Sequence, residues 1–215
     1  NVKIPTQEEL IAFEKNVKDI PNEFTEFRNL TIIKLFCGSG IRSEELIGLD
    51  MKDVFLQEES PYIMVWGKGN KEVQDRVPLS YEATDYLTEY FEYRKLFIEE
   101  KKEQNKSIDE TPVFISNKGE RISKGAIDDF FKRYSNDMIT PHMLRHWCGS
   151  HLYEDTKNIK LVQRVLRHKN IAVTAENYVH VSDDEVDSAV KMLRTDRQNV
   201  GQCNQSNQQQ FTGLM

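Results

Sequence analysis

The sequence has no run of eighteen apolar residues, so it contains no candidate transmembrane helix. It also lacks an initiator methionine, because the chain begins with Asn1, and no signal-peptide pattern follows. We therefore expect a cytoplasmic protein, and a chain that is either a fragment of a longer protein or a processed form.

Cysteine is scarce as well. The three cysteines are odd in number and show no metal-ligand spacing: Cys37, Cys148 and Cys203. This pattern argues against a disulfide framework and favours reduced thiols in a cytosolic protein.

An overall excess of positive charge is missing too. The net charge of −6 argues against a protein that simply coats nucleic acid. The charge is uneven, however: from Lys118 to Lys169, eleven Lys and Arg residues stand against six Asp and Glu, whereas residues 1–117 carry fifteen against twenty-three. If the fold gathers these basic residues on one surface, a phosphate ligand would be drawn there. The alternative is a random fluctuation along a charged chain.

What the chain does contain is a strong helical pattern. Thr6 and Glu9 form a capping-box signature, and Thr140 followed by Pro141 marks a second helix start. Apolar spacing predicts helices at residues 7–18, 23–37, 43–48 (capped by Ser43), 80–104, 123–134, 159–167, 172–180 and 183–193, and one beginning at residue 141. Residues 196–215 are rich in Gln and Asn, and we expect a flexible polar tail there.

The period changes between Asp50 and Ser80. Three short strands are predicted at residues 54–56, 62–66 and 73–79, and Gly67–Asn70 is a hairpin signal with Lys68 at its tip. The expected fold class is therefore α+β, mainly α-helical, with a small three-stranded antiparallel sheet.

The segment from Thr140 to His180 carries all five histidines. His142 and Arg145 are three residues apart and share one helix face. A His beside an Arg suits a site that grips a phosphate and moves a proton. Tyr178 follows His168 by ten residues and becomes a nucleophile when its proton is removed. The alternative is that His142 caps or packs and that Tyr178 fills the edge of the core.

Two earlier residues fit the same chemistry. Arg42 follows two glycines at a predicted helix start, where free backbone N–H groups favour an anion. Lys68 reaches away from the predicted sheet. Taken alone, each is better explained as an ordinary surface residue.

Five motifs occur along the chain in this order: SGIRSEEL, GKGNKEVQDRVPL, PHMLRH, LVQRVLRH and AENYVH. Together they cover roughly residues 5–195, and the sequence resembles the catalytic domain of the tyrosine recombinases, the phage-integrase family. The resemblance implies a catalytic domain over residues 1–195, a tail over 196–215, and an N-terminal core-binding domain that this chain lacks.

The resemblance also implies roles. Arg42 and Arg145 would clamp the scissile phosphate, His142 would be the histidine of the His-x-x-Arg motif, and His168 would bond a non-bridging oxygen. Glu45 would support the site from behind.

Tyr178 would be the nucleophile, forming a 3′-phosphotyrosine link, and Lys68 would protonate the leaving 5′ oxygen. No metal, ATP or other cofactor is expected, because guanidiniums compensate the phosphate charge. Candidate DNA-binding residues are Lys71, Lys118, Lys124, Arg164 and Lys169.

The implied partner is double-stranded DNA, and strands would be exchanged in a homotetramer on paired sites, with a monomer when free. The predicted helix 183–193 would dock on a neighbouring subunit or pack within its own. The implied location is the bacterial cytosol, at the nucleoid, and the implied role is integration or excision of a mobile element.

Two departures stand out. The spacing between His168 and Tyr178 is one residue longer than is common in the family, and Arg167 stands where glycine is usual. Three other functions remain open: a zinc enzyme using His142 and His146, a non-cleaving DNA-binding relic or accessory factor, and a type IB topoisomerase.

Overall fold

A computed structural model describes residues 3–67 and 72–168, all within one unit, Asn1–Val179. Lys68, Lys71, Lys169 and Tyr178 lie outside the described residues, as do the helices expected at 172–180 and 183–193 and the tail. The elements are α1 (Gln7–Lys18), α2 (Glu23–Ser39), α3 (Ser43–Ile47), a 3-10 turn (Met51–Asp53), β1 (Val54–Phe55), β2 (Tyr62–Trp66), β3 (Gln74–Pro78), α4 (Tyr81–Glu103), α5 (Lys124–Tyr134), α6 (Pro141–Thr156) and α7 (Ile159–Leu166).

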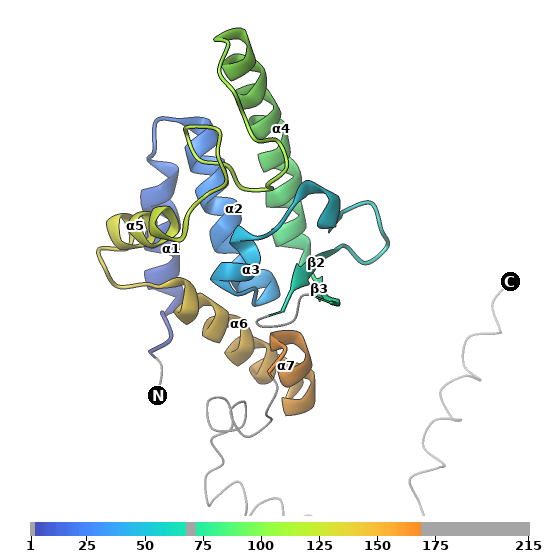
Figure 1. Cartoon of the computed structure of the whole chain (residues 1–215). Helices are drawn as coiled ribbons and strands as arrows, with labels where there is room; N and C mark the ends of the chain where they lie inside the picture. Colours follow the sequence, from blue (N-terminus) through green and yellow to red (C-terminus); the bar gives the residue numbers. More distant parts are fainter. Residues whose placement is uncertain (1–2, 68–71, 169–215) are drawn as a thin grey trace, which may run out of the picture. The chain divides into compact units, whose positions relative to one another are not determined.

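Helix α2 is the centre of the core, and α1, α4 and α6 pack around it (Figure 1). A helix that is apolar on all sides is stable only when it is buried on all sides. Its side chains at positions 30, 32, 33, 35 and 36 are all at most 1% exposed. Lys34 is the charged residue within this run, and it pairs with Glu14 of α1 at 2.7 Å and Glu82 of α4 at 2.8 Å.

The three strands form an antiparallel sheet in the order β1-β2-β3, as predicted. Ile63 pairs with Val77, and both are fully buried, because alternate residues of a strand face the core. Trp66 ends β2 and stays 45% exposed. The third strand begins at Gln74, one residue later than predicted, and Val73 is 65% exposed.

The predicted helix starts are confirmed at four places. Thr6 and Glu9 form the capping box, and the side chains of Ser80, Ser123 and Thr140 each accept a backbone N–H in the first turn. The cap of α3 is different: Ser43 is its first helical residue and Arg42 is the N-cap. Helix α2 runs two residues beyond its predicted end.

Two buried arginines, one from α2 and one from α4, donate hydrogen bonds to the segment 110–117. Arg94 of α4 donates to the carbonyls of Glu110, Pro112 and Val113, at 2.8 to 3.1 Å. Arg28 of α2 donates to the carbonyl of Ile115 at 3.1 Å. These charged donors satisfy carbonyls of a chain segment that has few sheet partners. None of the helices formed by the described residues has the length and hydropathy needed to cross a lipid bilayer.

Candidate active site

The candidate site begins where the ends of two helices meet. Gly40 ends α2 in the left-handed conformation, with φ of 58°. A Cβ at this position would lie 2.6 Å from Cδ2 of Leu166, the last residue of α7. Glycine is therefore required twice, for the backbone conformation and for the close approach. As a result, helix-end carbonyls from α2 and α7 converge on one place.

Arg145 of α6 joins the two helix ends. Its Nη1 donates to the carbonyl of Gly40 and its Nη2 to the carbonyl of Leu166. The residue is only 5% exposed. Arg145→Ala would leave two helix-end carbonyls without these donors, so we expect it to destabilise the fold.

Arg42 and Glu45 lock together at the start of α3. The Arg42 backbone N–H donates to Oε2 of Glu45 at 2.9 Å, and its Nη1 donates to Oε1 at 2.6 Å. Its Nη2 donates to the carbonyl of Arg167 at 2.9 Å. Glu45 is the third residue of α3. At this position a carboxylate accepts a hydrogen bond from the N-cap backbone N–H and interacts favourably with the helix dipole. This explains why Arg42, rather than Ser43, occupies the cap.

Arg167 completes the cluster. Its backbone lies in the left-handed region with φ of 54°, and its Nη2 donates to Oε2 of Glu45 at 2.6 Å. A non-glycine residue in this conformation costs on the order of 1–2 kcal/mol. Burial alone would raise the pKa of Glu45, but Arg167 and the contacts from Arg42 hold that pKa below its ordinary value. Glu45 is therefore a carboxylate shared by two guanidiniums.

Three histidines lie beside the arginines. The Nε2 atoms of His142 and His146 are 2.9 Å apart, so one ring donates and the other accepts. Burial, and then the neighbouring charges, lower the pKa of His146 and of His168 to about 4. Burial and Arg145 lower the pKa of His142 in the same direction. At neutral pH each ring is uncharged and can both donate and accept a proton.

Two of these arginines and two of these histidines meet at one open pocket, lined by residues of α2, α3, α5 and α6 and by the loops beside them. The lining residues are Phe36, Ile41, Arg42, Ser43, Glu44, Lys124, Pro141, His142, Arg145 and His168. Four of the six predicted catalytic residues therefore line the same pocket. The other two, Lys68 and Tyr178, lie outside the described residues.

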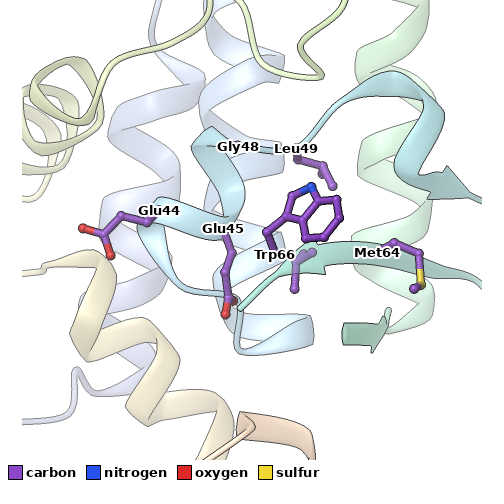
Figure 2. Close-up of a pocket in the computed structure, with 7 residues that line it drawn as sticks. Glu44, Glu45, Gly48, Leu49, Met64 and Trp66 are labelled. Carbon is purple, nitrogen blue, oxygen red and sulfur yellow. The ribbon is translucent and has the colours of Figure 1, made fainter. Parts of the chain in front are cut away.

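A second, smaller pocket lies on another side of Glu45, between α3 and β2 (Figure 2). Trp66 and Met64 of β2 line it together with Leu49. Figure 2 shows Glu44 and Glu45 leaving α3 in different directions. Glu45 thus lies between the arginine cluster and the end of β2, the strand that leads into the predicted lysine hairpin.

The candidate DNA-binding residues differ in position. Lys124 is exposed and lines the pocket with Arg42. Its Nζ lies 4.0 Å from Oε1 of the exposed Glu44. Lys118 and Arg164 are also exposed, but neither lines the pocket.

Sequence reasoning missed two residues of the cluster. His146 was considered only as a zinc ligand, although the four-residue spacing that suggested zinc also allows the direct contact with His142. No group of three His, Cys, Asp or Glu residues within 3–67 and 72–168 is placed to hold a metal ion. Arg167 was noted as a departure from the family, and its contact with Glu45 was not foreseen.

Comparison with known proteins now gives the family. Residues 6–185 match the phage integrase family. The chain belongs to that family. It is 37% identical over 165 residues to the tyrosine recombinase XerC of Thermodesulfovibrio yellowstonii, across 74% of this chain and 52% of the relative. It is 33% identical over 166 residues to the tyrosine recombinase XerD of Staphylococcus epidermidis, with the same coverage. The chain thus spans about half the length of the curated relatives it matches.

Solved structures agree on the fold. The XerH site-specific recombinase bound to difH substrate superimposes with a TM-score of 0.72 at 24% identity, covering 91% of this chain and 55% of that one. The catalytic domain of bacteriophage HP1 integrase gives a TM-score of 0.56 at 18% identity, covering 89% and 95%. The predicted fold class, and the resemblance to the phage-integrase family, are confirmed.

Proposed function

We propose that this chain is the catalytic domain of a site-specific tyrosine recombinase, which cuts and rejoins DNA through a 3′-phosphotyrosine intermediate. The observation that carries the proposal is the pocket itself. Arg42, Arg145, His142 and His168 line it together, and they come from three parts of the chain: the start of α3, helix α6 and the segment after α7. Two guanidiniums and two neutral imidazoles form a donor set suited to a phosphodiester.

The chemistry follows from these groups. Guanidiniums neutralise the negative charge on the non-bridging oxygens as it develops, so the reaction needs no metal. The hydroxyl oxygen of Tyr178 would bond to phosphorus while the bond to the 5′ oxygen breaks. The tyrosine proton would pass to a neutral ring at the pocket, for which His142 is suited by its exposure. Lys68 would supply a proton to the leaving 5′ oxygen.

The link to Tyr178 conserves the phosphodiester energy, and a 5′-hydroxyl from a partner strand reverses the step. Glu45 would hold Arg42 in place, and Lys124 would contact the backbone of the DNA near the cleaved phosphate. Lys71, Lys118, Arg164 and Lys169 are further DNA-contact candidates.

The rest of the biological setting is part of the same proposal. Residues 1–195 would form the catalytic domain, with 196–215 as a tail and a core-binding domain elsewhere in the full protein. The protein would work in the bacterial cytoplasm as a homotetramer on paired DNA sites, with the segment 183–193 exchanged between subunits. Its role would be integration or excision of a mobile element.

The experiment is covalent trapping. The full-length protein is incubated with a nicked substrate, taken from the flanks of its own element, whose cleaved strand cannot be religated. We expect a protein–DNA adduct that resists denaturant, maps to Tyr178 and is absent in Tyr178→Phe. Binding without an adduct would instead identify a non-cleaving DNA-binding factor. Relaxation of supercoiled DNA by one protein molecule acting alone, without strand exchange between two sites, would identify a topoisomerase.

A further inference from the structure

Arg167 occupies a position that does not suit it. It is the residue after α7, in the left-handed conformation with φ of 54° and ψ of 43°, which glycine adopts without steric cost. Its Nε is buried and has no hydrogen-bond partner among the described residues. Both features oppose folding, and glycine would avoid both. A strained residue that persists under such conditions indicates that its side chain has a use.

That side chain reaches the supporting carboxylate. Its Nη2 donates to Oε2 of Glu45 at 2.6 Å, and its Nη1 donates to the carbonyl of Val165 at 2.9 Å. The Arg167 side chain is 10% exposed and that of Glu45 is 2% exposed. The contact is therefore shielded from water, so its geometry is more tightly held than that of a surface ion pair.

Glu45 divides its two oxygens between the two arginines. Oε1 accepts from Nη1 of Arg42, while Oε2 accepts from Arg167 and from the Arg42 backbone N–H. The backbone of Arg167 contributes again, because its carbonyl accepts from Nη2 of Arg42 at 2.9 Å. Nη2 of Arg42 also donates to the carbonyl of Leu166 at 3.3 Å, so one terminal nitrogen of Arg42 is held by backbone and the other by the carboxylate that the Arg167 side chain contacts.

We propose, on the basis of the proposed function, that Arg167 is a positioning residue that fixes Glu45 and so aims Arg42 into the pocket. With Arg167 in place, Oε2 is occupied and Arg42 holds Glu45 through a single side-chain nitrogen. Without it, Oε2 keeps only the Arg42 backbone N–H and can accept a second donor, so that the Arg42 guanidinium can form a fork with both oxygens. That fork would rotate the guanidinium away from the orientation that faces a phosphate.

Removal of Arg167 also changes the electrostatics of the pocket. His168 is faced by Arg145 and His146 from α6, by Arg42 before α3, and by Arg167 beside it, with Lys124 and Glu44 on the same pocket. A positive neighbour disfavours the charged form of a histidine. Burial is the largest cause of the lowered pKa of His168 and Arg167 the smallest named one, so loss of the Arg167 charge should raise that pKa only slightly from its value of about 4.

The test uses Arg167→Gly and Arg167→Lys in the full-length protein, with the nicked-substrate assay, thermal melting and histidine titration by NMR. We expect the Gly variant to melt near the wild-type temperature, because glycine suits the backbone, yet to form adduct about ten- to a hundredfold more slowly. The Lys variant retains the charge without the planar fork, so its rate should fall between the two. The pKa of His168 should rise in Gly and stay near the wild-type value in Lys.

The outcomes separate the two proposals. If the wild-type protein forms no adduct, the proposed function is overturned, and the His168 titration still tests the electrostatic reach of Arg167. If the wild type cleaves and the Gly variant cleaves equally fast, the positioning role is overturned. If the Gly variant does not fold, the Lys variant decides: a rate equal to that of the wild type overturns the role, and a reduced rate supports it.

Discussion

The protein contains two clusters of buried arginines that are built in the same way and face different surroundings. At one end, Arg28 and Arg94 donate to the carbonyls of the segment 110–115. At the other, Arg145 donates to the carbonyls that end α2 and α7. Their exposed fractions are 8%, 7% and 5%. Burial and backbone contacts therefore do not distinguish a structural arginine from one that lines the candidate site.

The residues that surround each arginine distinguish the two clusters. Arg28 lies over the ring of Phe24, with its guanidinium carbon 5.5 Å from the ring centroid, and Arg94 lies near Tyr90. Arg145 lines an open pocket with neutral histidines. We call the first pair the scaffold arginines. An arginine that binds protein on one edge and faces a pocket on the other can take an anionic ligand, whereas the scaffold arginines have their donors committed to the chain.

The largest effect should come from exchanging the fork of Arg145 for a point charge. Arg145→Lys is expected to slow adduct formation by about 10³-fold, because Lys cannot hold two helix-end carbonyls and a phosphate in one plane. The matched control, Arg94→Lys, should melt at a lower temperature but cleave at the wild-type rate per folded molecule. Equal loss of cleavage in both variants would show that the two clusters do not differ in function.

The sequence was informative wherever local chemistry decides. Thr6 with Glu9, Ser80, Ser123 and Thr140 marked helix starts, because a side-chain acceptor near free amides acts within one turn. The sheet followed from period-two alternation. The residues proposed to bind the phosphate were recognisable because their types match the chemistry that they would perform.

The sequence was silent where the fold brings distant segments together. The carbonyl that meets Arg42 belongs to Arg167, which lies 125 residues away in the chain. The predicted N-cap of α3 was wrong. Ser43 is a good capping residue by local rules, but the buried Glu45 accepts from the Arg42 backbone N–H, and Arg42 therefore occupies the N-cap. Neither contact leaves a periodic signal. The similarity between the two arginine clusters likewise could not be predicted from the sequence.

The second prediction concerns the scaffold arginines. Arg94→Ala should lower the free energy of unfolding by roughly 2–4 kcal/mol, because three carbonyls lose a charged donor and two of these hydrogen bonds are buried. Urea unfolding of the full-length protein measures this change. Arg121→Ala offers a control, since Arg121 also donates to carbonyls but is half-buried. A loss as large in Arg121→Ala as in Arg94→Ala would contradict the importance of burial.

The third prediction uses pH to separate the two clusters. His146 and His168 have folded pKa values of about 4, below the ordinary value of about 6.5. Between these values the unfolded chain binds more protons than the folded one. Stability contributed by the two neutral rings is therefore full above pH 6.5 and is lost as pH falls toward 4. After allowance for solvent screening, the total loss should be about 1–2 kcal/mol.

Urea titrations at pH 7, 6 and 5 would record this slope. The double variant His146→Gln, His168→Gln should have a shallower slope over the same range. If the slope is unchanged, carboxylates elsewhere in the chain account for the acid sensitivity. If added phosphate raises the His168 pKa, the pocket binds anions as proposed.

The smallest effect should separate two lysines, one beside each cluster. Lys124 lines the pocket with Arg42 and Arg145. Lys118 follows Asn117, whose side-chain oxygen accepts from Nη1 of Arg28 at 3.0 Å. Both lysines are exposed and carry the same charge. Lys124→Ala should weaken DNA binding about three- to tenfold and reduce the slope of log K against log salt by about 1, as expected for one lost phosphate contact.

Lys118→Ala is the matched control, because it removes the same charge beside the scaffold arginines. We expect its affinity and salt slope to match those of the wild type. Fluorescence anisotropy with the natural site at several salt concentrations measures both quantities. If the two variants lose affinity equally, DNA responds to total charge, and the pocket has no special hold on the phosphate backbone. If only Lys124→Ala changes the slope, the DNA backbone passes the pocket, and the pocket-facing arginines are the ones that meet it.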